Sequence, residues 1–411
     1  MDYCISHSSK SVQGEILLPA SKSLSNRALI IQALCEGPFS ISNLSQAKDT
    51  QVLEEALKST TTEINVGDAG TSMRFLTALL SSKNQEVIIS GSKRMHERPV
   101  APLVEALNTL GANISYLKKE GYPPLHIQKG NIQGGEITID SSISSQFISA
   151  LLLIAPTLKR GLTIKLQGEL VSKSYLEMTL KMMAYFGVEY NWNSQTIQIK
   201  EQQYQAKDIC IEADWSAAAF WLEIVALAKD ANVNLIGLNE SSWQGDSASL
   251  DIFSKLGVDY HFEGNKLNLQ KAENKHSNNE FNLVETPDLA QPICCTFGGL
   301  KRLLTLKGLS TLKIKETDRI IALQSELKKM GVNTSVTQET IQINSFKNTS
   351  ATPSIRTYQD HRMAMSFAPL SLIHDKVIIE DISVVEKSYP NYWEDLKKVG
   401  FIIKPLVHSS S

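Results

Sequence analysis

One pattern of hydrophobic and polar positions recurs along the chain. Each copy has a β-rich apolar run, a polar loop, a run of helical periodicity ending in glycine, and a second β-rich run. The glycine is typical of a left-handed helix cap, after which the chain turns back into a strand. Most copies begin roughly 70 residues apart, which is too long for a solenoid repeat and long enough for a small α/β lobe. The copies cover residues 84–117, 160–192, 231–262, 303–336 and 375–405, and a weaker copy without the final glycine covers 37–66.

A second kind of segment lies between the copies, in which a polar cluster directly precedes an apolar, small-residue run of helical length. Helices that are apolar on every side belong inside a domain, with sheets packed around them. Each polar cluster then lies at a helix N-terminus, where free N–H groups and the helix dipole favour anions. The segments are PASKSLSNRALI (19–30), GTSMRFLTALL (70–80), SSQFISALLLIA (144–155), DWSAAAFWLEIVALA (214–228), DLAQPICCTF (288–297) and DHRMAMSFAPLSLI (360–373). Six lobes of this kind fit two domains of three.

Composition and charge exclude several classes of protein. The 411 residues are 42% hydrophobic and carry a net charge of −2, which suits a soluble globular protein and argues against a general nucleic-acid binder. Any anion site must therefore be a local gathering of cations. Five scattered cysteines form no disulfide framework, and we interpret Cys294 and Cys295 as buried small residues rather than zinc ligands. No apolar run approaches the ~20 residues of a membrane span, and the first strand pattern begins by about residue 12, so we expect a cytoplasmic protein without a signal peptide.

Basic side chains gather on the loops that lead into the apolar helices. One such loop means little, since an ordinary capped helix with solvated Lys22 and Arg27 explains the first stretch equally well. Four more motifs (RMHERP, LKIKETDRI, TYQDHRMAM and VVEKSYPNY) repeat the arrangement and together indicate a cleft for a polyanion, which arginine binds bidentately. Acids accompany them, and the residues alone leave open whether each is an ion-pair partner or a general acid or base. The cations assigned to the site are Lys22, Arg27, Arg98, Lys315, Arg319, Arg362 and Lys387, and the acids are Asp288, Glu316 and Asp360, the last beside His361.

At these motifs the chain resembles the EPSP synthase (3-phosphoshikimate 1-carboxyvinyltransferase) family of enolpyruvyl transferases. The matching motifs are, in order, LPASKSLSNRALI, GDAGTSMRFL, RMHERPVAPLVEAL, SSQFISALLL, LVSKSYLEMTLKMM, IKETDRI, TYQDHRMAM and EKSYPNYWEDL. They run from about residue 12 to residue 400. The resemblance implies an α/β fold of two domains, each of three βαβαββ lobes, with the active site in the interdomain cleft. Residues 1–20 and 214–411 are expected to form a discontinuous domain, with residues 21–213 inserted as the other.

The resemblance also implies the reaction. The family transfers the enolpyruvyl group of phosphoenolpyruvate to the 5-hydroxyl of shikimate 3-phosphate and releases phosphate, through a tetrahedral intermediate. The product leads to chorismate and aromatic amino acids. No metal or organic cofactor is expected, and the expected partners are the two small-molecule substrates, without nucleic acid or membrane, for a protein that is a monomer.

The family's functional residues are carried over motif by motif. The catalytic set is Lys22, Asp288, Glu316 and His361. In it, Asp288 accepts the hydroxyl proton and Glu316 gives and retakes the proton on C3, with Lys22 able to assist. Shikimate 3-phosphate is expected to contact Lys22, Ser23, Arg27, Ser144, Ser145, Ser172, Tyr175, Asp288 and Lys315. Phosphoenolpyruvate is expected to contact Lys22, Gly70, Arg98, Gln146, Arg319, Arg362 and Lys387.

Three positions depart from the family pattern. Asp68 stands where many members have Asn, and its charge weakens phosphoenolpyruvate binding unless it pairs with Arg74 or Arg98 or points away. Phe75 replaces a proline of some members. Thr311 replaces an asparagine of some members, which removes one expected shikimate contact. Gly70 is retained and leaves room for the inhibitor glyphosate, so we predict sensitivity to it.

Three other functions compete with this interpretation. The sister transferase that acts on UDP-N-acetylglucosamine resembles this fold, but it carries a cysteine general acid on a mobile loop, and no cysteine lies between Cys35 and Cys210. A catalytically dead anion-binding homologue would have lost Lys22, Asp288, Glu316 or Arg362, and all four are present. An RNA 3′-phosphate cyclase of similar lobed architecture would need a basic surface, which the charge balance does not support.

Overall fold

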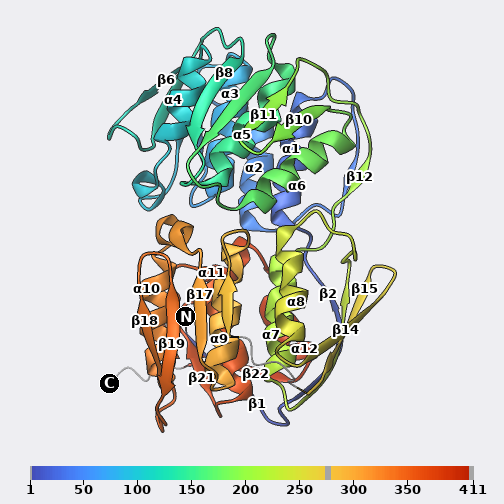
Figure 1. Ribbon diagram of the computed structural model, residues 1–411, viewed down its shortest axis with the longest axis vertical. Coiled ribbons are helices and arrows are strands. Elements are labelled where there is room, and N and C mark those ends of the chain that lie inside the picture. The colour runs from blue at the N-terminus through green and yellow to red at the C-terminus, as the bar shows by residue number, and fades with distance from the viewer. Residues whose placement is uncertain (1, 274–278, 407–411) are drawn as a thin grey trace. The chain divides into compact units, whose positions relative to one another are not determined.

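The computed structural model describes residues 2–273 and 279–406. Its contacts divide the chain into two compact units, and in Figure 1 the colour runs from blue to green along one and from yellow to red along most of the other. The discontinuous unit comprises Met1–Ala20 and Glu212–Ser411, and the inserted unit comprises Ser21–Ile211. None of the described helices has both the length and the apolar character needed to cross a membrane.

The chain re-enters the discontinuous unit at Glu212 rather than at the expected Asp214. Local pairing accounts for the difference. Ala213 forms an isolated antiparallel bridge with Ala20, and the Asp214 amide donates to the carbonyl of Pro19 at 2.9 Å. The returning segment is therefore tied to the strand end that precedes the insertion. That the two units are the two predicted domains stays a prediction.

The discontinuous unit contains three four-stranded sheets. The first has the order β14 (Val258–Glu263), β15 (Lys266–Lys271), β13 (Asp230–Ile236), β2 (Ser11–Leu17). The second has the order β16 (Glu280–Asn282), β17 (Leu304–Lys307), β19 (Ile341–Phe346), β18 (Val332–Val336). The third has the order β20 (Ser354–Ile355), β21 (Val377–Ile379), β1 (Tyr3–His7), β22 (Phe401–Pro405).

Three helices with little polar surface form the centre of this unit's core. They are α7 (Trp215–Leu227), α9 (Ala290–Gly299) and α11 (His361–Phe367), which contact one another. Figure 1 shows α7 and α9 side by side. Cys294 and Cys295 of α9 are fully buried, as predicted. The outer elements are α8 (Ser249–Ser254), α10 (Arg319–Lys329) and α12 (Tyr392–Lys398), with short 3-10 helices η3 (Gly245–Ala248), η4 (Pro287–Leu289), η5 (Ser310–Ile314), η6 (Ala368–Leu372) and η7 (Ile382–Lys387).

The inserted unit repeats this design with one reduced lobe. Its four-stranded sheets have the orders β4 (Glu63–Asn65), β5 (Val87–Ser90), β7 (Leu125–Gln128), β6 (Asn113–Tyr116), and β10 (Tyr190–Asn193), β11 (Thr196–Ile199), β9 (Leu162–Gln167), β8 (Gly135–Asp140). A third sheet has two strands, β12 (Ile209–Cys210) and β3 (Ile41–Ser42). The helices are α1 (Lys22–Leu34), α2 (Lys48–Lys58), α3 (Gly70–Ser82), α4 (Ala101–Thr109), α5 (Ser145–Ile154) and α6 (Lys173–Tyr185), with η1 (Met95–Glu97) and η2 (Ala155–Thr157).

All five four-stranded sheets share one topology, which explains the sequence repeat. In each, an edge strand runs parallel to its neighbour, and the remaining two pairings are antiparallel. The two-stranded sheet keeps only the parallel pair. This reduced sheet belongs to the weak copy at 37–66, whose last β-run becomes β4 of the neighbouring sheet.

The repeat's terminal glycines lie where a left-handed backbone is needed. The φ angles of Gly111, Gly187, Gly257, Gly331 and Gly400 are 103°, 83°, 84°, 79° and 99°. Residues with a Cβ rarely adopt such angles, so glycine lets each outer helix stop and return as a strand. The prediction of glycine caps is confirmed at all five copies that carry one.

Glu223 interrupts the apolar surface of α7. Its side chain is 0% exposed, and neither carboxyl oxygen has a hydrogen-bond partner among the described residues. Burial raises its pKa well above the ordinary value for glutamate. The carboxyl group is therefore protonated in the folded protein at a pH where the unfolded chain ionises it.

A pH-dependent stability follows from this protonation. Because the native state binds the extra proton, the free energy of unfolding falls as pH rises above the unfolded pKa of about 4.3, by up to ~1.4 kcal/mol per pH unit. Urea titrations from pH 5 to pH 8 should show a smaller decline for Glu223→Gln than for the wild type. Glu326→Gln is the control, since that buried carboxylate accepts from the Arg356 amide at 3.0 Å and the Tyr358 hydroxyl at 2.8 Å. An equal decline in the wild type and Glu223→Gln would show that Glu223 is not the titrating group.

Candidate active site

In the inserted unit, most candidate residues lie at or near the N-terminal ends of α1, α3, α5 and α6, and Arg98 lies between η1 and α4. Arg27 of α1 links three of these helices, because its guanidinium donates to Thr179 Oγ1 at 2.7 Å, Ser149 Oγ at 3.3 Å and the Tyr175 carbonyl at 3.3 Å. A further bond goes to the Ser23 carbonyl at 3.0 Å. Burial lowers the pKa of Arg27 to about 10, so it remains a cation at neutral pH. All of these acceptors are neutral, which leaves the positive charge available to an anion.

Arg98 is the second such cation. Its side chain is 7% exposed, and it makes no ion pair or side-chain hydrogen bond with any described residue. The guanidinium lies against the first residue of α3, since a Cβ added to Gly70 would come within 2.7 Å of both terminal nitrogens. Gln146 is tied to the same helix end by a 3.4 Å bond from Nε2 to Thr71 Oγ1. The structure thus brings Arg98, Gly70 and Gln146 together, and no residue that it describes supplies a counter-charge to Arg98.

Three of the serines expected to contact shikimate 3-phosphate lie at the starts of α5 and α6. Ser144 caps α5 by accepting from the Gln146 amide at 3.3 Å, and Ser145 is the first residue of that helix. Ser172 precedes α6 with a φ of 54°, a left-handed conformation that a serine rarely adopts. This backbone conformation sets the direction in which α6 begins. It also accompanies near-complete burial of Ser172, which is 5% exposed.

Lys22 has a partner that the sequence did not reveal. Its Nζ lies 3.2 Å from Asp49 Oδ2, on α2. Asp49 is 27 residues away along the chain and lies outside the recognised motifs, so no local signal marked it. The same aspartate's carbonyl accepts from Ser72, which connects α2 to α3 at 3.1 Å.

The residues that depart from the family pattern have clear surroundings. Asp68 is exposed and accepts a hydrogen bond from the Ser92 hydroxyl. Phe75 is buried, and the Arg27 guanidinium lies 5.5 Å from its ring centre. Thr311 is 7% exposed, and its hydroxyl has no hydrogen-bond partner among the described residues.

In the discontinuous unit, four cations, Lys315, Arg319, Arg362 and Lys387, pair with a group of acids. Arg319, the first residue of α10, pairs with Asp360 at 2.6 Å, Asp288 at 2.9 Å and Glu316 at 2.9 Å. Lys387 pairs with Glu316 at 2.9 Å. Four short segments that are far apart in sequence therefore meet at one charged cluster.

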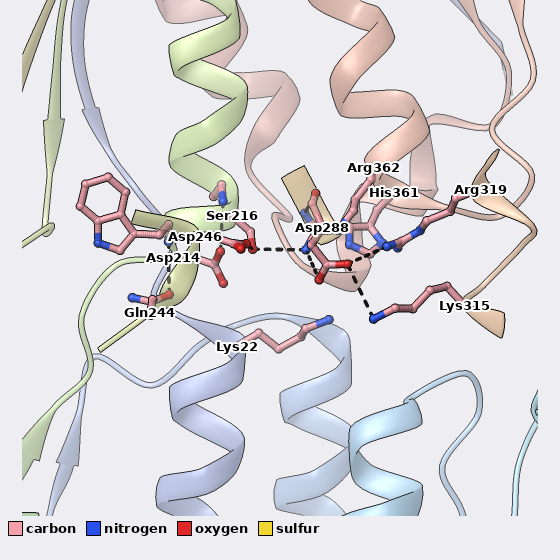
Figure 2. Close-up of polar contacts among 12 residues, drawn as sticks. Lys22, Asp214, Ser216, Gln244, Asp246, Asp288, Lys315, Arg319, His361 and Arg362 are labelled. Atoms are coloured by element: carbon pink, nitrogen blue, oxygen red, sulfur yellow. Dashed lines mark hydrogen bonds and ion pairs between the residues drawn. The ribbon is translucent and has the colours of Figure 1, made fainter. Parts of the chain in front are cut away.

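Asp288 is the most heavily paired of these acids. Its carboxylate contacts Arg362 at 3.0 Å, Arg319 at 2.9 Å and Lys315 at 3.7 Å, as Figure 2 shows. Burial alone would raise its pKa, but the three cations hold the pKa well below the ordinary value for aspartate. Asp288 is therefore ionised at neutral pH.

His361 lies beside this cluster, at the first position of α11. It is 2% exposed, and its Nδ1 is 3.7 Å from Asp360 Oδ1. Asp360 caps α11 by accepting from the Arg362 amide at 2.9 Å. No group of three or more His, Cys, Asp or Glu that suits a metal ion occurs in the described ranges.

Comparison with known proteins decides the family. The family model for EPSP synthase (3-phosphoshikimate 1-carboxyvinyltransferase) matches residues 7–65 and 56–396. The chain belongs to the EPSP synthase family. Among EPSP synthases, the 3-phosphoshikimate 1-carboxyvinyltransferase of Bacteroides fragilis (strain YCH46) is 45% identical over 407 residues, which cover 98% of this chain and 99% of the relative. The corresponding protein of Sulfurovum sp. (strain NBC37-1) is 37% identical over 421 residues, covering 95% and 97%.

The fold agrees with that of a solved EPSP synthase. The structure from Acinetobacter baumannii has a TM-score of 0.79 and covers 98% of this chain and 100% of its own. Its identity is 20%, so this match shows the fold alone. The predicted α/β enolpyruvyl transferase fold and the resemblance to the EPSP synthase family are both confirmed.

Proposed function

We propose that the chain transfers the enolpyruvyl group of phosphoenolpyruvate to the 5-hydroxyl of shikimate 3-phosphate, as the names of its EPSP synthase relatives imply. The observation that carries the proposal is Asp288, a carboxylate that is only 13% exposed and is held by three cations of the family's motifs. The buried cations of the inserted unit, Arg27 and Arg98, supply the complementary charge for two anionic substrates. We propose that both units act on the same pair of substrates.

The role of each residue follows from its charge and surroundings. For shikimate 3-phosphate we propose Lys22, Ser23, Arg27, Ser144, Ser145, Ser172, Tyr175, Asp288 and Lys315. For phosphoenolpyruvate we propose Lys22, Gly70, Arg98, Gln146, Arg319, Arg362 and Lys387. Asp288, Glu316 and Lys22 handle protons, and His361, buried beside Asp360, completes the catalytic set.

Binding of substrate anions prepares the base. With Arg362, Lys315 and Arg319 all paired to it, Asp288 holds protons weakly and is a poor base. Substrate carboxylate and phosphate groups compete for Arg319 and Arg362 and take over part of their charge. The proton affinity of Asp288 then rises toward the value that a general base needs.

The chemistry proceeds by addition and elimination. Glu316 protonates C3 of phosphoenolpyruvate while the 5-oxygen attacks C2 and its proton passes to Asp288, which gives a tetrahedral intermediate with a C3 methyl group. Phosphate then leaves C2 and takes up the proton held by Asp288, and Glu316 takes one proton back from C3 to restore the double bond. The guanidinium and ammonium groups stabilise the negative charge on the departing phosphate. No step requires a metal or organic cofactor.

The setting of the enzyme is proposed from the sequence. A cytoplasmic monomer whose partners are its two substrates fits the composition and the family. Size-exclusion chromatography with light scattering checks the monomer, and a mass near 45.5 kDa is the expected result.

Phosphate release tests the proposed reaction. Purified protein receives phosphoenolpyruvate with shikimate 3-phosphate in one arm and with UDP-N-acetylglucosamine in another. We expect release only with shikimate 3-phosphate, because the family comparisons favour that acceptor. Release with the nucleotide sugar, or none from folded protein with either acceptor, would contradict the proposal.

Glyphosate sensitivity is a further expected outcome. Gly70 lets the Arg98 guanidinium approach α3, where a Cβ would come within 2.7 Å of both terminal nitrogens. A glyphosate titration should therefore inhibit turnover in competition with phosphoenolpyruvate. Gly70→Ala should weaken the binding of both glyphosate and phosphoenolpyruvate, because the alanine Cβ displaces Arg98 from an ionic contact with the ligand. For phosphoenolpyruvate we expect a loss of affinity of about tenfold. No inhibition at concentrations far above the phosphoenolpyruvate KM would contradict the expectation.

A further inference from the structure

Asp246, in η3, is a buried carboxylate outside the residues expected to contact substrate. It is 5% exposed, and its Oδ2 accepts a hydrogen bond from the Ser216 hydroxyl. Ser216 Oγ in turn lies 3.2 Å from Nη2 of Arg362. Figure 2 shows the resulting series of contacts from Arg362 through Ser216 to Asp246.

The direction of these bonds is fixed by the groups themselves. A guanidinium only donates, and an ionised carboxylate only accepts. The single hydroxyl proton of Ser216 must therefore point to Asp246, which turns an oxygen lone pair toward Arg362. Asp246 thus fixes the orientation of the Ser216 hydroxyl, and the Ser216 oxygen accepts a hydrogen bond from one nitrogen of the Arg362 guanidinium, Nη2.

The loop that carries Asp246 is itself anchored. Gln244 Nε2 donates to Glu212 at 2.9 Å and to the Ala213 carbonyl at 2.8 Å, while Gln244 Oε1 accepts from the Trp215 amide at 3.2 Å. These bonds join the loop to the segment that leads into α7. Asp246 and Ser216 are consequently held by the same local framework, and Asp246 is in a position to act on Arg362 without loop movement.

Arg362 contacts the carboxylate of Asp288 directly and that of Asp246 through Ser216, and the charge of Asp288 changes during the proposed reaction. It donates to Asp288 Oδ2 at 3.0 Å and to the Asp288 carbonyl at 3.1 Å. When Asp288 accepts the hydroxyl proton, it loses the charge that attracts the guanidinium. We propose that Asp246 is a positioning residue that holds Arg362, through Ser216, against phosphoenolpyruvate throughout the reaction. The inference rests on the proposed role of Arg362 in binding that substrate.

The surroundings of Asp246 add a pH dependence. Burial and the nearby charge of Asp288 raise the pKa of Asp246 to about 6, Asp214 adds to the rise, and Arg362 and the Ser216 hydrogen bond oppose it. Helix α8 also packs against η3, and its one ionisable residue, Asp251, is exposed. As pH falls through about 6, Asp246 gains a proton and its hold on Arg362 weakens.

Asp246→Asn tests the inference, because it removes the charge while retaining the size and an acceptor oxygen. We expect the KM for phosphoenolpyruvate to rise about tenfold, as for loss of a hydrogen bond to a charged group. The kcat and the KM for shikimate 3-phosphate should stay within about threefold. In the wild type, the KM for phosphoenolpyruvate should also rise as pH falls through about 6, by more than in the variant. Ionisation of phosphoenolpyruvate itself changes the KM of the wild type and of Asp246→Asn alike, so the difference between the two proteins reports on Asp246.

Ser216 provides the matched variants. Ser216→Ala should reproduce the rise in the KM for phosphoenolpyruvate, whereas Ser216→Thr retains the hydroxyl and should keep the wild-type KM. The double variant Ser216→Ala with Asp246→Asn should have a KM no higher than that of either single variant. Calorimetric titration of the same variants with phosphoenolpyruvate compares their Kd values without turnover. The comparison of Ser216→Ala with Ser216→Thr still tests the inference if Asp246→Asn does not fold. If the KM and the Kd for phosphoenolpyruvate are unchanged in Ser216→Ala, the inference is overturned, even if the wild-type protein is fully active and the proposed function therefore holds. Wild-type protein that binds phosphoenolpyruvate but releases no phosphate would overturn the proposed function instead.

Discussion

Asp288→Asn is expected to lower kcat by about 10²- to 10⁴-fold, the range in which general bases contribute to enzymatic rates. The amide is nearly the same size as the carboxylate, but it cannot accept the hydroxyl proton. Steady-state phosphate release measures the effect. Asp251→Asn on α8 is the control, since that carboxylate is exposed and should leave kcat unchanged. A kcat within threefold of the wild type would exclude Asp288 as the base.

The same variant should not bind phosphoenolpyruvate more weakly. Under the proposed function, Asp288 competes with phosphoenolpyruvate for Arg362 and Arg319, so removal of its charge makes these cations more available. We expect the Kd from calorimetric titration to be equal to or lower than that of the wild type. A higher Kd would mean that Asp288 serves mainly to orient the cations.

Arg98→Met is expected to raise the KM for phosphoenolpyruvate by about 10²-fold or more, because two charge-assisted hydrogen bonds are lost. Its effect on stability should be small. Since the Arg98 guanidinium has no hydrogen-bond or ion-pair partner in the described part of the chain, we expect the free energy of unfolding to change by less than about 1 kcal/mol. Urea titration and steady-state kinetics on the same preparation measure both quantities.

Arg74→Met is the matched control for Arg98. Arg74 is also buried, but it donates to the Gly70 carbonyl at 3.0 Å and the Pro99 carbonyl at 2.9 Å, and it lies over the ring of Phe147. Its loss removes two hydrogen bonds and a contact with an aromatic ring at a buried position, so we expect a destabilisation of about 2 kcal/mol. Equal losses of stability in the two variants would contradict the distinction between a structural and a substrate-binding arginine.

Much of the fold was predictable because its information is local. A run of helical periodicity that ends in glycine marked each outer helix, and Gly187 and Gly331 show the required left-handed angle. The repeat also indicated the number of lobes. It did not reveal that the lobe containing β3 and β12 keeps only two strands, because their pairing joins residues 41–42 to residues 209–210. A partner so distant in sequence leaves no periodic signal.

The site was predictable to a similar depth. Cations before buried helices marked the proposed binding residues, since polar clusters at helix starts are recognisable in a single sequence. The partners of those cations were not predictable. Asp49 pairs with Lys22, and Asp246 reaches Arg362 through Ser216, across separations that only the folded chain closes. Glu223 was missed for the opposite reason, because one acid in an apolar helix does not change the pattern that predicts burial.

Hydrogen exchange at C3 of phosphoenolpyruvate tests the central claim, that the chain transfers the enolpyruvyl group by addition and elimination. The reaction is run in D₂O with shikimate 3-phosphate, and the product is examined by proton NMR and mass spectrometry. The intermediate has a methyl group at C3, so one of three hydrogens leaves when the double bond returns. The account predicts 5-enolpyruvylshikimate 3-phosphate with deuterium at C3, and no incorporation when shikimate 3-phosphate is omitted. A product without deuterium at C3 would contradict it.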